Sequence, residues 1–413
     1  MADSSKPRAL IIDPSLHSPD GHHLGVLQRF QTELANLQLG SMSLVSLSAS
    51  EELGHKANLI PAFERGIYYR SQWTQQEFND CAANFCADLD TAIRKLRIRP
   101  ELFVLPAADQ ATILGLAHYL RRHRRRKPPV ILLWLMMAPH YKKSIDDPSI
   151  GRHLAEYNEA FHALRKAVAD DSRLHVCCET NAMARAYEPH VGLQIETVIV
   201  HKLIQQPRKR RVRQPGEPIN IVCAGNANAA KGYFLLPETI DRLNRKRGDL
   251  RFLIHGTVEK TDYPQGRQVL QRLSCLSPNV TVRTDVLSTD DYLAWLTQAD
   301  LILLPYDPYV YKTRGSGVCS EAAKLGIPVV ATKDCDFAKD AIEERRAVGI
   351  EEFNAESLAN AVLTAVDHLE EMTACAVDYA ARHSVDEHFE RLLSAAASAT
   401  ERRTSWFYRM LGW

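Results

Sequence analysis

The chain has 413 residues, of which 45% are hydrophobic and 24% are charged, and its formal net charge is +1. This length exceeds one ordinary hydrophobic core and predicts two domains of about 200 residues each. The balanced charge gives no general attraction to nucleic acid, and the longest apolar run, Val130 to Ala138, is too short to cross a bilayer as a helix. The nine cysteines include no C-x-x-C pair, and the start from Met1 to Lys6 is polar. We therefore expect a reduced, cytoplasmic protein without a disulfide framework or a secretion signal.

Short β-rich runs alternate with amphipathic helical stretches in residues 1–204, which is typical of βαβ units around a parallel sheet. The predicted strands are Ala9–Asp13, Ser43–Leu47, Leu102–Leu105, Val130–Leu135, Leu174–Cys178 and Glu196–Val200. The predicted helices are Gly21–Leu37, Gln75–Leu96, Gln110–Arg125, Gly151–Ala169 and Asn181–Tyr187. This order predicts a first Rossmann-like domain.

A polar stretch, residues 205–218, separates this half from the next; its three prolines, one glycine and five basic residues predict an interdomain linker. Residues 219–383 repeat the alternating pattern, with strands predicted at Ile219–Ala224, Arg251–His255, Val280–Arg283, Leu301–Leu304, Pro328–Ala331 and Val348–Ile350. The expected fold class is therefore α/β, with two Rossmann-like, doubly wound parallel-sheet domains facing across a cleft. Ligands of such sheets bind at the carboxyl ends of the strands.

The most informative pattern lies after the predicted strand Leu301–Leu304. A loop leads to Ser316, Gly317 and Val318, where a helix is predicted to begin and to run to Gly326. Backbone N–H groups of a first helical turn have no partners within the helix and attract anions. Glu321 follows one turn later, where it can accept hydrogen bonds from sugar hydroxyls. Together these features predict a nucleotide-sugar site.

A second phosphate candidate follows the predicted strand Ile219–Ala224, where Gly225 and Asn226 precede Lys231 and Gly232. A lysine beside a glycine can reach a diphosphate as a point charge. A solvated lysine at a helix start explains Lys231 equally well. The phosphate interpretation gains support because Lys231 and Ser316 both follow strands of one predicted sheet.

Residues 219–332 resemble, in motif order and spacing, the nucleotide-binding domain of GT-B glycosyltransferases, most closely glycosyltransferase family 4, whose members retain the anomeric configuration. The motifs that carry the resemblance are Gly225 with Lys231-Gly232, Ile254-His255-Gly256, Asp300 to Pro305, and Glu321-Ala322 to Val330. The resemblance implies that the diphosphate is held by Lys231, Arg314 and the backbone of Ser316, Gly317 and Val318. It also implies that Glu321 binds the ribose and that Val286 flanks the base. Further candidates for the donor site are Gly225, Asn226, Gly256 and Tyr311.

Two positions depart from the family pattern. Asn226 stands where the family has an arginine, so we expect Arg314 to supply the missing positive charge. Thr313 stands where the family has the first of two glutamates, so the family's contact to the donor sugar is absent or replaced. The residues that crowd the same loop are candidates for that contact, with a packed aromatic turn as the alternative: Tyr306, Asp307, Tyr309 and Tyr311.

In the first half, Gly21, His22 and His23 follow the first predicted strand and resemble the G-H-H opening of bacterial polysaccharide-type glycosyltransferases. One of the two histidines is expected to stabilise the leaving phosphate or to orient the acceptor, with a capping or surface histidine as the alternative. Weaker candidates also follow predicted strands of this half, and loop solvation or helix capping explains them at least as well: Asp109, His140 and Glu179 to Asn181.

Two basic segments suggest peripheral contact with an anionic membrane surface, at the inner face of the membrane. Arg121 to Lys127 ends a predicted helix, where cations are favoured in any case, and Arg402 to Trp413 mixes basic with aromatic residues. The GT-B resemblance offers another explanation for residues 384–413, because in that fold a C-terminal helical segment crosses back to the first domain.

We therefore expect an enzyme that transfers a sugar from a nucleoside diphosphate sugar to a glycan, a lipid-linked glycan or another hydroxyl acceptor, in bacterial polysaccharide or glycoconjugate synthesis. We expect no cofactor and no metal, because Asp334-Cys335-Asp336 has the D-x-D letters but follows a strand beyond the predicted site. A GT-B epimerase or phosphorylase is one alternative, and a non-catalytic nucleotide-sugar-binding protein is another. A dehydrogenase is disfavoured because no G-x-G-x-x-G follows the first strand.

Overall fold

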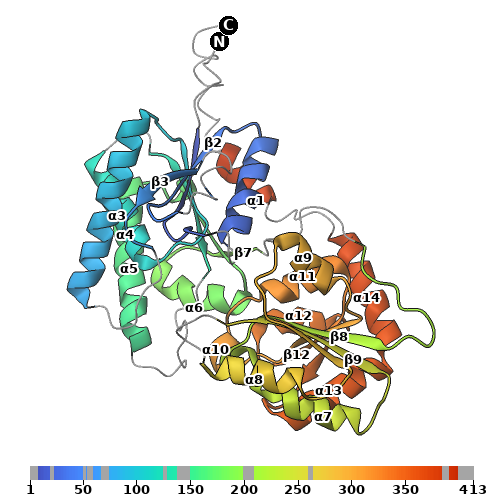
Figure 1. Ribbon diagram of the computed structural model, residues 1–413. Helices are drawn as coiled ribbons and strands as arrows, with labels where there is room; N and C mark the ends of the chain where they lie inside the picture. The colour runs from blue at the N-terminus through green and yellow to red at the C-terminus, as the bar shows by residue number, and fades with distance from the viewer. Residues whose placement is uncertain are drawn as a thin grey trace, which may run out of the picture. The chain divides into compact units, whose positions relative to one another are not determined.

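A computed structural model of the chain describes residues 8–18, 23–49, 53, 59–66, 74–123, 128–136, 149–198, 209–258, 264–383 and 390–398. The described residues form two compact units (Figure 1). Unit 1 contains the described residues up to 198 together with 390–398, and unit 2 contains residues 209–383.

Unit 1 is built on a seven-stranded parallel sheet in the order β3-β2-β1-β4-β5-β6-β7. Its strands are β1 (Ala9–Asp13), β2 (Ser41–Ser46), β3 (Leu59–Phe63), β4 (Leu102–Leu105), β5 (Val130–Leu135), β6 (Leu174–Cys178) and β7 (Glu196–Thr197). Every residue of β1, β4 and β5 is buried. Their continuous apolar runs follow from this position, since a central parallel strand is covered on both faces.

Helices cover both faces of this sheet. They are α1 (His23–Asn36), α3 (Gln75–Leu96), α4 (Gln110–Arg122), α5 (Ser149–Val168), α6 (Asn181–Val191), the 3-10 helix η1 (Asp171–Arg173) and the helix of residues 390–398. One apolar core contains side chains of α3, α4, α5 and α6, and the other contains α1 and residues 392–397. Figure 1 shows the helix of residues 390–398, in red, beside α1. The end of the described chain therefore belongs to the core of unit 1.

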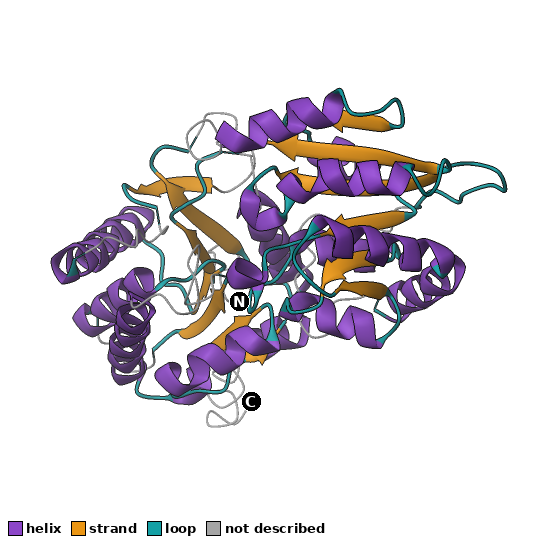
Figure 2. Ribbon diagram, turned by 90° about the horizontal axis from the view of Figure 1, so that it is seen from below, coloured by secondary structure: helices purple, strands orange, loops and turns teal. Residues whose placement is uncertain are grey.

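Unit 2 has a six-stranded parallel sheet in the order β10-β9-β8-β11-β12-β13. Its strands are β8 (Ile219–Asn226), β9 (Leu250–Thr257), β10 (Val280–Arg283), β11 (Leu301–Leu304), β12 (Val329–Thr332) and β13 (Ala347–Ile350). Its helices are α7 (Leu236–Asn244), α8 (Pro264–Ser274), α9 (Thr289–Leu296), α10 (Pro308–Tyr311), α11 (Gly317–Leu325), α12 (Asp336–Glu343), α13 (Ala355–Asp367) and α14 (Leu369–Arg382), with the 3-10 helices η2 (Ala229–Lys231) and η3 (Tyr233–Leu235). One core joins α7, α8 and α13 to the sheet, and the other joins α9, α11 and α12. Figure 2 shows the resulting layers, with helices on both sides of each sheet.

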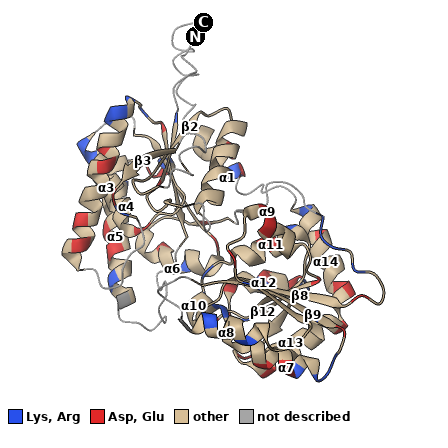
Figure 3. Cartoon of the chain, in the orientation of Figure 1, with Lys and Arg blue, Asp and Glu red and all other residues tan. Residues whose placement is uncertain are grey.

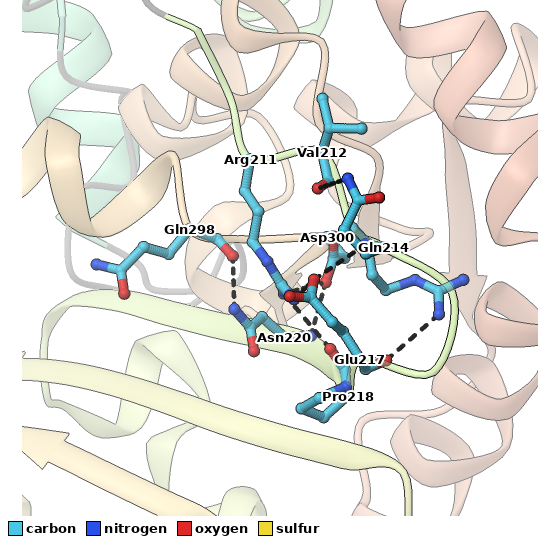
Figure 4. Close-up of polar contacts among 9 residues, drawn as sticks. Arg211, Val212, Gln214, Glu217, Pro218, Asn220, Gln298 and Asp300 are labelled. Carbon is cyan, nitrogen blue, oxygen red and sulfur yellow. Dashed lines mark hydrogen bonds and ion pairs between the residues drawn. The ribbon is translucent and has the colours of Figure 1, made fainter.

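The described part of the predicted linker, residues 209–218, is bound to the amino-terminal edge of the unit 2 sheet (Figure 4). Arg211 bonds to Asp300 at 2.9 Å and to Glu217 at 2.6 Å. Asp300 also accepts the backbone N–H of Asn220 at 2.8 Å, and the Asn220 side chain donates to the Gln298 carbonyl. Asp300 therefore joins β8 to β11 at the edge of the sheet opposite to the carboxyl ends of these strands. This structural role accounts for the aspartate of the sequence motif.

Charged side chains lie mainly on the helices and loops, and the strands carry few (Figure 3). At the end of α4, the buried Asp90 of α3 pairs with His123 at 2.8 Å and with Arg122 at 3.7 Å. Part of the basic segment Arg121 to Lys127 thus has a structural partner; residues 124–127 lie outside the described residues, as do residues 399–413.

The structure corrects several predicted elements of unit 1. The edge strand β3, which contains Pro61, was not among the predicted strands; an edge strand tolerates the missing N–H of a proline. Strand β2 begins at Ser41 and ends at Ser46, and β7 is limited to Glu196–Thr197. Helix α6 continues past Tyr187 to Val191 and ends at Gly192, which has a positive φ of 68°.

Candidate active site

The loops after β8 and β11 meet at the point where the strand order of unit 2 reverses. In doubly wound sheets, this switch point is where ligands bind. The backbone N–H of Asp307 donates to the Ala230 carbonyl at 2.9 Å, which joins the two loops. Gly232 has a φ of 69°, and a Cβ at this position would collide with the Pro305 carbonyl. A glycine is therefore required where the two loops touch.

Lys231 lies at this junction. The Asn228 side chain accepts the backbone N–H of Lys231 at 2.9 Å and caps the 3-10 helix η2. The ammonium lies over Gly225, whose φ is 124°, in the space that a Cβ of any other residue would enter. It also lies 5.6 Å from the centre of the Tyr306 ring. The two glycines of the sequence motif thus have separate tasks: Gly225 admits the ammonium, and Gly232 admits the neighbouring loop.

Helix α11 begins at Gly317, as predicted, with Ser316 as its N-cap. The Ser316 hydroxyl accepts the N–H of Cys319 at 3.2 Å. The N–H groups of Gly317 and Val318 belong to the first turn and have no acceptor within the helix. The helix ends at Gly326, whose φ of 66° lets the chain turn into β12.

The Glu321 carboxylate faces back toward this helix start. Glu321 is only 4% exposed. Its Oε2 accepts a hydrogen bond of 3.1 Å from the hydroxyl of Tyr292 on α9. Its Oε1 lies 3.9 Å from the point where a Cβ on Gly317 would stand. One carboxylate oxygen is therefore bonded to α9, and the other lies near the N-terminus of α11.

Aromatic rings and cations fill the loop between β11 and α11. The rings of Tyr306 and Tyr311 are 4.5 Å apart, and the Arg314 guanidinium lies 4.5 Å from the centre of the Tyr311 ring. Tyr306, Tyr311 and Thr313 are buried, whereas Tyr309 is 65% exposed. Two cations, Lys231 and Arg314, thus lie on the two members of one tyrosine pair.

The remaining unit 2 candidates lie on the β9 and β10 side of the same edge. The Asn226 side chain accepts the Thr257 hydroxyl at 2.7 Å, which connects β8 to β9. Gly256 packs under α8, because a Cβ there would meet Leu270 and Ala227 within about 3 Å. Val286, in the loop between β10 and α9, is 69% exposed.

In unit 1, His23 is the first residue of α1 and is buried beside the last residue of β1. Its Nδ1 lies 2.8 Å from Asp13 Oδ2, so Asp13 fixes the orientation of the ring. Gly21, His22 and His140 lie outside the described residues. Asp13 was not among the predicted site residues, although an acidic residue at the carboxyl end of a central strand was the available signal.

Asp109 and Thr180 cap helices in unit 1. Asp109 is the N-cap of α4, and its Oδ1 accepts the N–H of Thr112 at 2.8 Å. Burial raises the pKa of the Asp109 carboxyl to about 7, against the smaller opposing effect of these hydrogen bonds. Thr180 caps α6, and the side chain of Asn181 accepts the Thr197 hydroxyl at 2.9 Å. Helix capping therefore accounts for Asp109 and Thr180.

Within the described part of the chain, no group of three or more His, Cys, Asp or Glu side chains is arranged to hold a metal ion. The described helices also include none that is long and apolar enough to span a membrane.

Part of the chain is similar in sequence to a known family. Residues 218–368 match the family model "Glycosyl transferases group 1". The matched residues include most of unit 2. The match covers the β8 and β11 loops, α11 and α9, which carries Tyr292, so the candidate site lies inside the region of similarity. No curated protein matches the sequence significantly.

Solved structures extend the comparison to the whole chain. Anabaena HepE, in complex with UDP and glucose, has a TM-score of 0.62 and 12% identity, covering 97% of this chain and 100% of that one. Sucrose-phosphate synthase from Thermosynechococcus elongatus has a TM-score of 0.60 and 14% identity, covering 98% and 99%. A glycotransferase of kitacinnamycin has a TM-score of 0.58 and 16% identity, covering 95% and 99%. At these identities the likeness establishes the fold, and the predicted GT-B fold with two Rossmann-like units is confirmed.

Proposed function

We propose that this protein transfers a sugar from a nucleoside diphosphate sugar to a hydroxyl acceptor, which is a glycan or a lipid-linked glycan of a bacterial polysaccharide or glycoconjugate. The observation that carries the proposal is the convergence of Lys231, the N-terminus of α11 and Glu321 at the switch point of unit 2, inside the region similar to glycosyl transferases group 1. A cation and the N–H groups of a first helical turn suit a diphosphate. A carboxylate beside them suits the hydroxyls of a ribose.

The proposed chemistry needs stabilisation of the departing diphosphate more than it needs a protein nucleophile. The bond between the sugar C1 and the β-phosphate oxygen breaks, and its electron pair leaves with the diphosphate. The acceptor oxygen forms the new bond to C1, and its proton passes to the departing phosphate. Lys231, Arg314 and the N–H groups of Gly317 and Val318 would stabilise the negative charge that develops. This course retains the anomeric configuration and requires no metal ion.

In this proposal unit 1 supplies the acceptor side. The His23 ring, oriented by Asp13, contacts the acceptor or the leaving phosphate, and His22 is the adjacent candidate. The segments Arg121 to Lys127 and Arg402 to Trp413 bring the protein to the inner face of a membrane, where a lipid-linked acceptor would lie. Flotation with anionic vesicles tests this membrane contact. A protein that stays in the dense fraction, and does not float with the vesicles, would refute it.

Incubation with UDP-, GDP-, ADP- and dTDP-sugars, with products read by mass spectrometry, tests the function. Release of a nucleoside diphosphate and a free or transferred sugar, unaffected by a chelator, is the expected result, and Glu321→Ala should abolish it. Proton NMR of the first product reports whether the anomeric configuration is retained.

One observation favours a second candidate function, nucleotide-sugar binding or epimerisation: Thr313 replaces an acidic residue of the family pattern and is buried. Nucleotide-sugar binding without turnover of any donor would assign a binding protein instead. A changed sugar on an intact nucleotide would assign an epimerase.

A further inference from the structure

A chain of contacts runs from Glu321 to the loop that carries Val286, through Tyr292 and through His255 of the Ile254-His255-Gly256 motif, neither of which was assigned a role from the sequence. The Tyr292 hydroxyl donates to Glu321 Oε2 at 3.1 Å. Burial and the neighbouring Glu321 charge raise the pKa of the Tyr292 phenol, so the hydroxyl keeps its proton and remains the donor. The Tyr292 ring meets the ring of His255 on β9 edge to face, with centroids 6.1 Å apart at an interplanar angle of 68°.

His255 continues the chain to the loop after β10. Its Nε2 lies 3.0 Å from the backbone carbonyl of Asp285, the residue before Val286. A carbonyl can only accept, so Nε2 carries the proton and Nδ1 does not. Burial lowers the pKa of this imidazole and keeps it neutral. Tyr233 also stabilises this region, because its hydroxyl donates to the His255 carbonyl at 2.7 Å and so bonds to the backbone of β9.

We propose that Tyr292 and His255 are positioning residues for the nucleoside half of the donor: Tyr292 fixes the carboxylate that reads the ribose, and His255 fixes the loop that contacts the base. The proposal rests on the proposed function of the same site. It follows from the position of the Glu321 carboxylate, whose Oε2 accepts the Tyr292 hydroxyl and whose Oε1 lies on the side of Gly317. It follows equally from the Asp285 carbonyl, which His255 holds next to the exposed Val286.

The two residues should therefore control different features of the nucleotide. Without the Tyr292 hydroxyl, the Glu321 carboxylate loses a hydrogen bond that orients it, and its hydrogen bonds to the 2′- and 3′-hydroxyls weaken. Without the His255 donor, the loop around Val286 is released, and selection among bases weakens while ribose recognition remains. A merely structural role would lower the affinity for all nucleotides alike.

The test measures dissociation constants by calorimetry. Wild type is first titrated with UDP, GDP, ADP and dTDP, and the ligand that binds most tightly is then compared with its 2′-deoxy and 3′-deoxy forms. Tyr292→Phe should weaken binding of the ribonucleotide by about tenfold, the value of one charge-assisted hydrogen bond, and binding of the deoxy forms by about twofold or less. In a Glu321→Ala background, Tyr292→Phe should have no further effect, since the carboxylate it positions is gone. Tyr379→Phe removes a hydroxyl from α14 of the same unit and serves as the control, with unchanged affinity.

For His255, Leu is compared with Gln, which keeps a side-chain N–H donor. His255→Leu should reduce the affinity ratio between the preferred and the other bases by about fivefold or more, as loss of one hydrogen bond predicts, and His255→Gln should restore part of it. The role of Tyr292 would be refuted if Tyr292→Phe lowered the affinity for ribo- and deoxynucleotides equally, or if its effect added to that of Glu321→Ala. The role of His255 would be refuted if His255→Leu left the affinity ratio between the bases unchanged. Absence of nucleotide binding by the wild type would instead refute the proposed function.

Discussion

Replacement of Lys231 by methionine should weaken the binding of a nucleoside diphosphate by about thirtyfold. The substitution shortens the unbranched side chain by one atom and removes the charge. Lys231 is partly buried, over Gly225 and against the Tyr306 ring, so water screens its charge incompletely. A unit charge about 4 Å from a phosphate oxygen is worth about 4 kcal/mol at an effective dielectric constant of about 20. Partial exposure and residual screening reduce this to about 2 kcal/mol, which corresponds to about thirtyfold.

Calorimetric titration of wild type and Lys231→Met at two salt concentrations measures this effect. The matched control is Lys246→Met, which makes the same change of charge after the end of α7, at the amino-terminal edge of the same sheet. The control should keep the wild-type affinity, and the salt dependence should be weaker in Lys231→Met than in both others. Equal effects of the two substitutions would refute the role of Lys231, because they would show that net charge alone governs binding.

Three predictions concern stability. Gly232→Ala should lower the thermal midpoint by several degrees, because it adds backbone strain of about 1–2 kcal/mol and a collision with the loop after β11. The control Gly248→Ala, whose Cβ would meet no atom within 4 Å, should leave the thermal midpoint unchanged. An unchanged midpoint in Gly232→Ala would show that the two loops adjust. Because burial raises the pKa of Asp109 to about 7 from an unfolded value of about 3.9, the folded state holds the proton more tightly. Wild type should therefore lose about 4 kcal/mol of unfolding free energy between about pH 4 and pH 7. In urea unfolding at a series of pH values, the unfolding free energy of Asp109→Asn should not show this decrease with pH. A decrease equal to that of wild type would show that another group causes it. Leu393→Ala should lower the free energy of unfolding of unit 1 by about 2–5 kcal/mol in urea, because Leu393 is fully buried in its core. The control Val377→Ala, at an exposed site, should change the free energy of unfolding little. If Leu393→Ala were as stable as wild type, the helix of residues 390–398 would not be docked on unit 1.

Most of the fold was predictable because its strands and helices carry local signals. The strand Val130–Leu135 is an uninterrupted apolar run, and Gln75–Leu96 begins with a Thr74–Glu77 capping box and ends in basic residues. Both elements have the predicted bounds. The edge strand Leu59–Phe63 was missed because its pairing with β2 is a tertiary contact, and nothing in its own residues outweighs the proline.

The candidate site was predictable where a backbone rule applies, and not where two distant segments meet. A glycine after a capping serine identified the start of α11, and a lysine beside glycine identified the β8 loop. The sequence could not show that Gly225 makes room for the Lys231 ammonium, or that Tyr292 holds one oxygen of Glu321 from 29 positions away. The first contact depends on the path of the loop after β8, and the second on the position of α9 beside α11; no local residue pattern predicts either.

Hydrogen exchange with and without a nucleoside diphosphate tests the central claim most directly. UDP, GDP, ADP and dTDP are each added to the wild-type protein, and backbone protection is mapped by mass spectrometry. The account predicts that the ligand that binds slows exchange in residues 225–232 and 314–321, the β8 loop and the start of α11, and that Glu321→Ala reduces this protection. Protection confined to other segments, or no protection with any of the four nucleotides, would contradict it.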